Sequence, residues 1–210
     1  MPAGCEWQIH AAIARALFLI ASLWFCCGVV LAADEQPSAT EMMEDLMYGR
    51  GSVGGPFTLT DQNGQKRSDS EFRGKLMIVY FGYTFCPDVC PADLMAITQA
   101  LDALGAAAEG IQPVFITVDP ERDTTLLKDY VAAFHPSLIG LTGSAEEIRK
   151  VANSYKAYYR QVPGERKGEY SIDHAGILYL MGRNGKYLGF LPPQTAPEKL
   201  TEVLRKYLAK

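Results

Sequence analysis

The apolar residues of this chain fall into patterns that predict different elements. Short continuous apolar runs are typical of strands covered on both faces of a sheet. Strands are expected at four such runs: 75–81, 112–118, 138–142 and 177–181. Apolar residues spaced three and four apart predict amphipathic helices with one buried face. Helices are expected at four stretches: 91–104, 124–134, 144–158 and 196–208.

Two Asn-Gly pairs, Asn63-Gly64 and Asn184-Gly185, predict tight turns between short strands. The expected hairpins pair 57–60 with 65–67 and 177–181 with 186–190.

Capping residues and a polar stretch complete the pattern. Asp123 is the expected N-cap of the second long helix. Ser144 and Glu147 match a capping box at the start of the third. The charged stretch 162–170 is expected to be a loop. Alternating strands and helices predict an α/β fold with a central, mostly parallel sheet, antiparallel hairpins at its edges and flanking helices. This order of elements is thioredoxin-like with additions.

The first 33 residues are expected to lie outside this fold. Arg15 is followed by an uncharged, mostly apolar stretch at 16–33. It fits either a cleaved signal peptide or a retained membrane anchor, and both export the rest of the chain. The expected organisation is therefore a leader or anchor at 1–33, a linker at 34–53 and one domain at 54–210.

Composition narrows the function classes. The 210 residues carry a formal net charge of −4, and Lys and Arg form no run, so a nucleic-acid partner is not expected. Of the five cysteines, three lie within the first 33 residues, and only Cys86 and Cys90 follow them. An oxidising compartment would tend to join this pair unless reduction or a metal intervenes.

The Cys-x3-Cys pair comes just after the strand expected at 75–81. Cys90 is expected at or just before a helix N-terminus, where free backbone N–H groups favour the thiolate. Two thiolates are soft ligands that select Cu(I), and a third ligand would let the site hold Cu(II) as well. The exported part has two histidines, His135 and His174. We expect His174 beside the cysteines, because it precedes the strand at 177–181, and we interpret His135 as a cation at a helix C-terminus.

Four segments of the chain resemble the Sco/SenC family of copper chaperones: Phe85–Pro91, Val118–Thr124, Gly140–Gly143 and Asp173-His174. The resemblance covers about residues 54–208. It implies a thioredoxin-like protein held at a membrane that binds copper, as Cu(I), Cu(II) or both, through Cys86, Cys90 and His174. It also implies a role in building the binuclear copper centre of cytochrome c oxidase.

The same resemblance implies the partners and the compartment. The expected partners are the copper-binding subunit of the oxidase, other copper carriers and thiol reductants. The expected location is the periplasm or the mitochondrial intermembrane space, with possible membrane attachment through residues 16–33.

Two other activities also use cysteines in this fold class, and the spacing here fits only the first of them. A thiol–disulfide oxidoreductase would reduce cysteines of exported proteins or of the oxidase copper site, and it would not need His174. A peroxidase of the peroxiredoxin kind wants Thr-x-x-Cys, whereas Thr84 precedes Cys86 by two positions. Whether this protein is an enzyme is therefore left open.

Several residues near the predicted site have more than one interpretation. Asp173 either orients His174 or caps a turn. Asp88 is either a solvated charge or tunes the cysteines. The charged group at 119–123 forms either a local network of salt bridges and caps or a contact with a partner. The methionines at 42, 43 and 47 fit the apolar face of a short amphipathic turn better than thioether ligands.

Overall fold

The structure is a computed structural model that describes residues 38–48 and 51–209. The expected leader or anchor at 1–33 lies outside these residues. Within them, no helix is both long enough and apolar enough to cross a bilayer.

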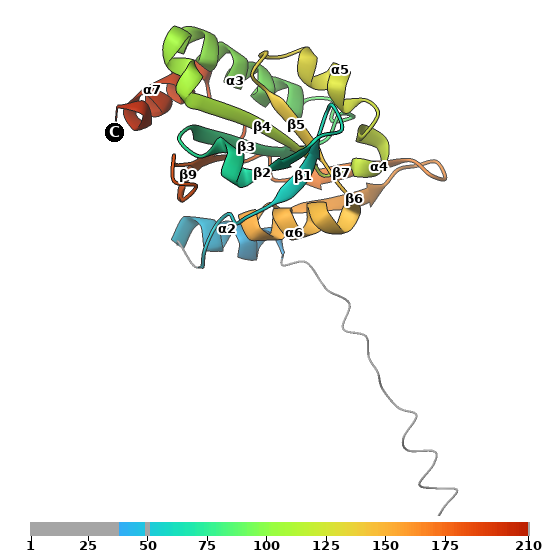
Figure 1. Ribbon diagram of the computed structural model, residues 1–210. Helices are drawn as coiled ribbons and strands as arrows, with labels where there is room; N and C mark the ends of the chain where they lie inside the picture. Colours follow the sequence, from blue (N-terminus) through green and yellow to red (C-terminus); the bar gives the residue numbers. More distant parts are fainter. Residues whose placement is uncertain (1–37, 49–50, 210) are drawn as a thin grey trace, which may run out of the picture. The chain divides into compact units, whose positions relative to one another are not determined.

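One mixed sheet organises the fold (Figure 1). Its strands run in the order β2-β1-β5-β4-β3-β8-β9. Their bounds are β1 Thr58–Asp61, β2 Lys66–Ser68, β3 Leu76–Gly82, β4 Ile111–Thr117, β5 Ile139–Thr142, β8 Leu178–Met181 and β9 Tyr187–Leu191. The central β3, β4 and β5 are parallel, and the β1–β2 and β8–β9 hairpins add antiparallel edges. The predicted α/β, thioredoxin-like architecture is confirmed.

Helices cover both faces of this sheet. The helices are α2 Ala39–Tyr48, η1 Asp69–Phe72, α3 Val89–Leu104, η2 Gly105–Gly110, α4 Pro120–Asp123, α5 Leu127–Ala132, α6 Ala145–Tyr155 and α7 Pro197–Leu208. In Figure 1, α3, α5 and α7 lie above the sheet, and α2 and α6 lie below it. Every residue of β3 and β4 is buried between these layers, which explains their continuous apolar sequence.

The described structure differs from the expected helices in two places. The helix expected at 124–134 is shortened to α5, because 124–126 form a turn, and a separate helix, α4, precedes it at 120–123. Asp123 does not cap a helix, because its buried carboxylate accepts hydrogen bonds from Thr84 and Thr117 instead. The helix that Ser144 opens ends at Tyr155, short of the expected 158, because Lys156 adopts a left-handed conformation with φ 57°.

The expected loop at 162–170 is confirmed at 164–169, where it forms the turn of a hairpin that the sequence pattern did not predict. This hairpin makes a second, two-stranded sheet. Its strands are β6 Tyr159–Pro163 and β7 Tyr170–His174. They pair antiparallel from Tyr159 opposite His174 to Pro163 opposite Tyr170. Their side chains are mostly exposed or half-buried, so no continuous apolar run marks them in the sequence. This hairpin shares no ladder with the seven-stranded sheet.

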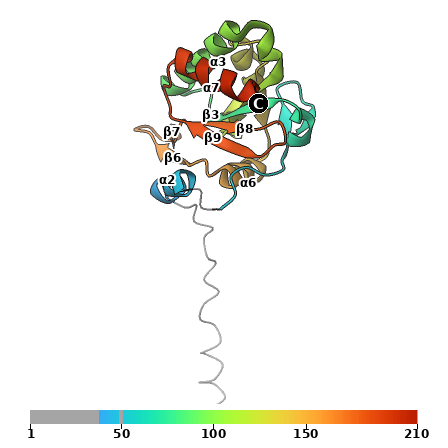
Figure 2. The same ribbon diagram turned by 90° about the vertical axis from the view of Figure 1, so that its left-hand side faces the viewer.

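The stretch expected to be a linker also contains structure. A helix of ten residues, α2, replaces the expected short turn. Met42 and Leu46 are buried, and Met47 is exposed. Asp45 forms an ion pair with Lys156 at 3.1 Å. Figure 2 shows α2 at the same end of the fold as α6. The burial of Met42 and Leu46 shows that the apolar face of α2 packs against the rest of the domain.

Candidate metal centre

The two cysteines lie where β3 leads into α3. Cys86 is on the turn after the strand, and its N–H donates to the carbonyl of Tyr83 at 3.2 Å. Cys90 is the second residue of α3, inside the helix rather than before it. Cys86 is partly exposed, whereas Cys90 is fully buried, and both are free thiols. The backbone N–H of Cys90 donates to the Sγ of Cys86 at 3.4 Å.

His174 arrives at the cysteines from the end of β7. Its Nε2 lies 3.3 Å from the Sγ of Cys90 and 3.9 Å from the Sγ of Cys86. The three side-chain donor atoms all lie within 4.8 Å of one another. The structure therefore brings together the three residues that the sequence singled out, although His174 is 84 and 88 positions from the two cysteines.

Backbone and aromatic contacts fix the imidazole ring. The N–H of Gly176 approaches Nδ1 at 3.3 Å, which leaves Nε2 facing the sulfurs. The rings of Tyr80 and Tyr83 meet the imidazole edge-on, with centroids 6.3 and 5.8 Å away. Asp173 does not orient the ring, because its exposed carboxylate lies 3.8 Å from Arg160.

The pKa values of the two thiols are shifted in opposite directions. A hydrogen bond from the Cys90 thiol holds the pKa of Cys86 well below its usual range, and contacts with His174 and backbone N–H groups add to this. Sharing that proton with Cys86, together with burial, raises the pKa of Cys90. The metal-free pair is therefore one thiolate, Cys86, beside one protonated thiol, Cys90.

A buried acid lies one turn beyond Cys90. Asp93 accepts hydrogen bonds from the hydroxyl of Tyr80 at 3.0 Å and from the N–H of Gln194 at 2.7 Å. Burial raises the pKa of Asp93. We did not predict this residue, although its place among the apolar positions of α3, next to Leu94, is the signal that could have indicated it.

Gly82, the last residue of β3, lies close to the sulfur of Cys90. A Cβ added there would lie 2.8 Å from the Sγ of Cys90 and 2.9 Å from a ring carbon of Phe115. Only glycine leaves the sulfur this much room, and the apolar pattern of the strand gave no sign of it.

The remaining predicted residues lie outside the three-residue cluster. His135 contacts the hydroxyl of Ser137 at 2.7 Å, and its Nε2 is 3.9 Å from Asp102. Asp88 is exposed at the start of α3. The group at 119–123 forms a local hydrogen-bonded network, as one of the two interpretations predicted.

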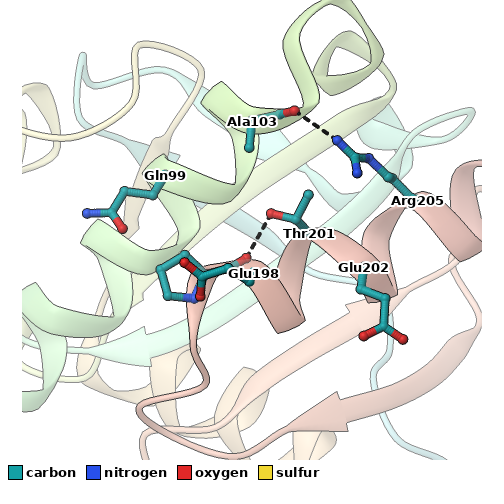
Figure 3. Close-up of a pocket in the computed structure, with 7 residues that line it drawn as sticks. Gln99, Ala103, Glu198, Thr201, Glu202 and Arg205 are labelled. Carbon is teal, nitrogen blue, oxygen red and sulfur yellow. Dashed lines mark hydrogen bonds between the residues drawn. The ribbon is translucent and has the colours of Figure 1, made fainter.

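A groove of about 440 Å³ lies between α3 and α7 (Figure 3). Arg205 reaches across it to the carbonyl of Ala103, and Thr201 donates to the carbonyl of Pro197. None of the three predicted ligands lines it, so it plays no part in the site.

Comparison with known proteins identifies the family. The SCO1/SenC family model matches residues 47–209, which include the whole site. The chain belongs to the SCO1/SenC family.

Relatives and solved structures agree with this assignment. The mitochondrial SCO2 homolog of Bos taurus is 36% identical over 189 residues, which are 89% of this chain and 70% of that protein. Bradyrhizobium japonicum ScoI, solved with copper bound, is 43% identical, with a TM-score of 0.69 over 74% of this chain and 99% of that one. BsSco is 26% identical, with a TM-score of 0.59 over 75% of this chain and 94% of that one. BsSco belongs to the Sco family of cytochrome c oxidase assembly proteins, and a disulfide switch has been identified in it.

Proposed function

We propose that this SCO1/SenC protein binds copper through Cys86, Cys90 and His174 and delivers it to the binuclear copper centre of cytochrome c oxidase. One observation carries the proposal: two unpaired sulfurs and one imidazole nitrogen lie within 4.8 Å of one another. A compact set of two soft thiolates and a borderline nitrogen suits copper. The copper-bound relative and the oxidase-assembly relative described above support the cargo and its destination.

The two oxidation states of copper would use the donors differently. Two thiolates are enough for Cu(I), and His174 adds the nitrogen that makes the site suitable for Cu(II). Cys86 is already a thiolate in the metal-free protein, so only the Cys90 thiol has to lose its proton when copper binds. Thiolates of an acceptor would then replace these ligands one at a time.

Oxidation would switch this site off. Joining the Cys86 thiolate and the Cys90 thiol forms one S–S bond, releases one proton from Cys90 and passes two electrons to an oxidant, which removes both thiolate ligands. Loading therefore requires a reduced pair, and we infer that an exported thiol reductant serves as a further partner. We also propose that the domain works outside the cytoplasm, as expected from the apolar stretch at 16–33 and in keeping with the mitochondrial relative.

Copper titration of the reduced full-length protein tests the three-ligand site. We expect thiolate–Cu(II) absorption bands that disappear in a Cys86→Ser variant. Because an imidazole ligand is lost, His174→Ala should weaken Cu(II) binding about tenfold or more. His135→Ala is the matched control, since that imidazole bonds Ser137 outside the cluster, and it should change nothing. Unchanged Cu(II) affinity in His174→Ala would contradict the proposal.

The asymmetry of the thiols favours a second candidate function, thiol–disulfide exchange. The Cys86 thiolate would attack a substrate disulfide to form a mixed disulfide, and Cys90 would resolve it by expelling the substrate thiol. This route needs no imidazole ligand. His174→Ala should therefore keep most of its disulfide-reducing rate while losing Cu(II) affinity, and the two activities can be measured separately on one variant.

A further inference from the structure

The two halves of the site belong to different parts of the fold. Cys86 and Cys90 follow β3 of the seven-stranded sheet, whereas His174 ends a hairpin that shares no ladder with that sheet. Pairing with β3 begins only at Leu178, four residues after His174, so it brings the end of β7 near the cysteines but leaves the rest of the hairpin unpaired with the central sheet. Other contacts are needed to hold the hairpin, and with it the imidazole, in one position.

A short segment between them contacts both halves. The helix α4 follows β4 directly, and the residue before it, Asp119, is 4% exposed. Asp123, the last residue of α4, is fully buried. Figure 1 places α4 beside the hairpin.

Asp123 holds the half that carries Cys86. Its carboxylate accepts the backbone N–H of Thr84 at 2.9 Å and the hydroxyl of Thr84 at 2.6 Å. Thr84 lies two positions before Cys86 on the same turn. A buried carboxylate that accepts two bonds from one residue fixes that residue in position and orientation.

Asp119 and Arg122 hold the half that carries His174. Arg122 forms an ion pair with Asp119, and its Nη1 donates to the carbonyl of Tyr170 at 3.1 Å. The hydroxyl of Tyr170 donates to Asp119 at 2.9 Å. Tyr170 is the first residue of β7 and His174 is the last. These two hydrogen bonds therefore hold the start of the strand that carries the imidazole.

The guanidinium of Arg122 also spans the two halves. Its central carbon lies 3.7 Å from the ring centre of Tyr170 and 4.9 Å from that of Phe85, the neighbour of Cys86. A planar cation in contact with two rings is attracted to both of them.

We propose that Asp119, Arg122 and Asp123 form a brace that sets the position of His174 relative to the two cysteines. They are positioning residues, because none of them belongs to the cluster of donor atoms. The inference rests on the proposed function only in naming copper as the cargo, since the contacts themselves concern the metal-free protein.

A double-mutant cycle on the full-length protein tests the brace. Arg122→Met keeps the length of the side chain and removes the charge and the planar group. We expect it to weaken Cu(II) affinity about tenfold, the scale of losing an outer partner of a ligand. In a His174→Ala background the same change should cost less than about threefold, because no imidazole is left to misplace.

The chain offers a matched control for Arg122. Arg67 is equally exposed at 26%, forms ion pairs with Glu71 and Asp61, and lies 5.3 Å from the ring centre of Phe72. Arg67→Met should leave Cu(II) affinity within about twofold of the parent in both backgrounds. Tyr170→Phe is the milder second variant: it removes only the hydroxyl that Asp119 accepts, and it should shift affinity in the same direction as Arg122→Met.

Amide hydrogen exchange in the metal-free protein separates failure of the brace from failure of the copper site. Arg122→Met should speed exchange in the peptide covering 170–174, and Arg67→Met should not. If His174→Ala kept full copper affinity, the proposed set of ligands would be wrong. Faster exchange at 170–174 in Arg122→Met would still support the brace. Unchanged exchange together with unchanged affinity in Arg122→Met would overturn it, and so would an equal loss of affinity with and without His174.

Discussion

Replacing Gly82 with alanine should distort the candidate metal centre without touching a ligand. The added Cβ would lie 2.8 Å from the Sγ of Cys90, 2.9 Å from Phe115 and 3.1 Å from Tyr80. All three residues are fully buried, so none can swing into solvent. Atoms in ordinary contact stay about 3.5–4.0 Å apart, so the sulfur has to shift by roughly 0.7 Å or more.

This displacement should lower both the stability of the protein and its affinity for copper. Overpacking a buried site typically costs about 1–3 kcal/mol, and the entropic gain of replacing glycine offsets about 0.4–1 kcal/mol. We therefore expect Gly82→Ala to lose about 1–2 kcal/mol of unfolding free energy. Metal sites tolerate ligand shifts of only about 0.2 Å, so copper affinity should also fall, by about tenfold.

Urea unfolding and copper competition measure the two effects. Gly55→Ala is the control, because the nearest atom to its Cβ would be the Cβ of Ser154 at an ordinary 3.6 Å. That variant should be as stable as the parent or slightly more stable. A Gly82→Ala protein that matched this control in both stability and copper affinity would refute the argument.

Three further outcomes follow from burial and proton affinity. In the metal-free reduced protein, the rate of Cys86 alkylation should change less than about threefold from pH 6 to 8, whereas an ordinary thiol gains nearly a hundredfold; a steep rise would show that the lowered pKa is wrong. Met42→Ala should cost about 2–5 kcal/mol in urea unfolding, and Met47→Ala, at an exposed position of the same helix, less than about 0.5 kcal/mol; equal effects would mean that α2 does not pack as described. Burial raises the pKa of Asp123. The contribution of this side chain to the free energy of unfolding is therefore fully present below its pKa in the unfolded chain, about 4, and is lost as the pH rises through its pKa in the folded protein. The stability of the parent relative to Asp123→Asn, measured by urea unfolding, should accordingly fall as the pH rises above about 4, and a rise would contradict the sign.

The central fold could be predicted because buried strands leave a strong signal. The sequence of β3 is continuously apolar since helices cover both faces of the strand, and only a strand in that position needs such a sequence. The β6–β7 hairpin could not be predicted in the same way. All of its strand residues except Ile172 are half-buried or exposed, and the two strands pair only with each other, so their sequence resembles that of a polar loop.

The three candidate ligands could be singled out for a different reason. Cys86, Cys90 and His174 are rare residue types with distinctive chemistry, and their order along the chain matched a family pattern. The supporting residues carry no such mark. The roles of Asp93 and Asp123 depend on partners such as Thr84, 39 positions from Asp123, which only the folded chain brings close.

The unequal exposure of the two sulfurs gives copper handover a direction. An incoming thiolate meets Cys86 at the surface, whereas Cys90 lies fully enclosed behind it. The acceptor should therefore displace Cys86 first and Cys90 last, and small chelators should strip the cargo faster than bulky ones of equal strength.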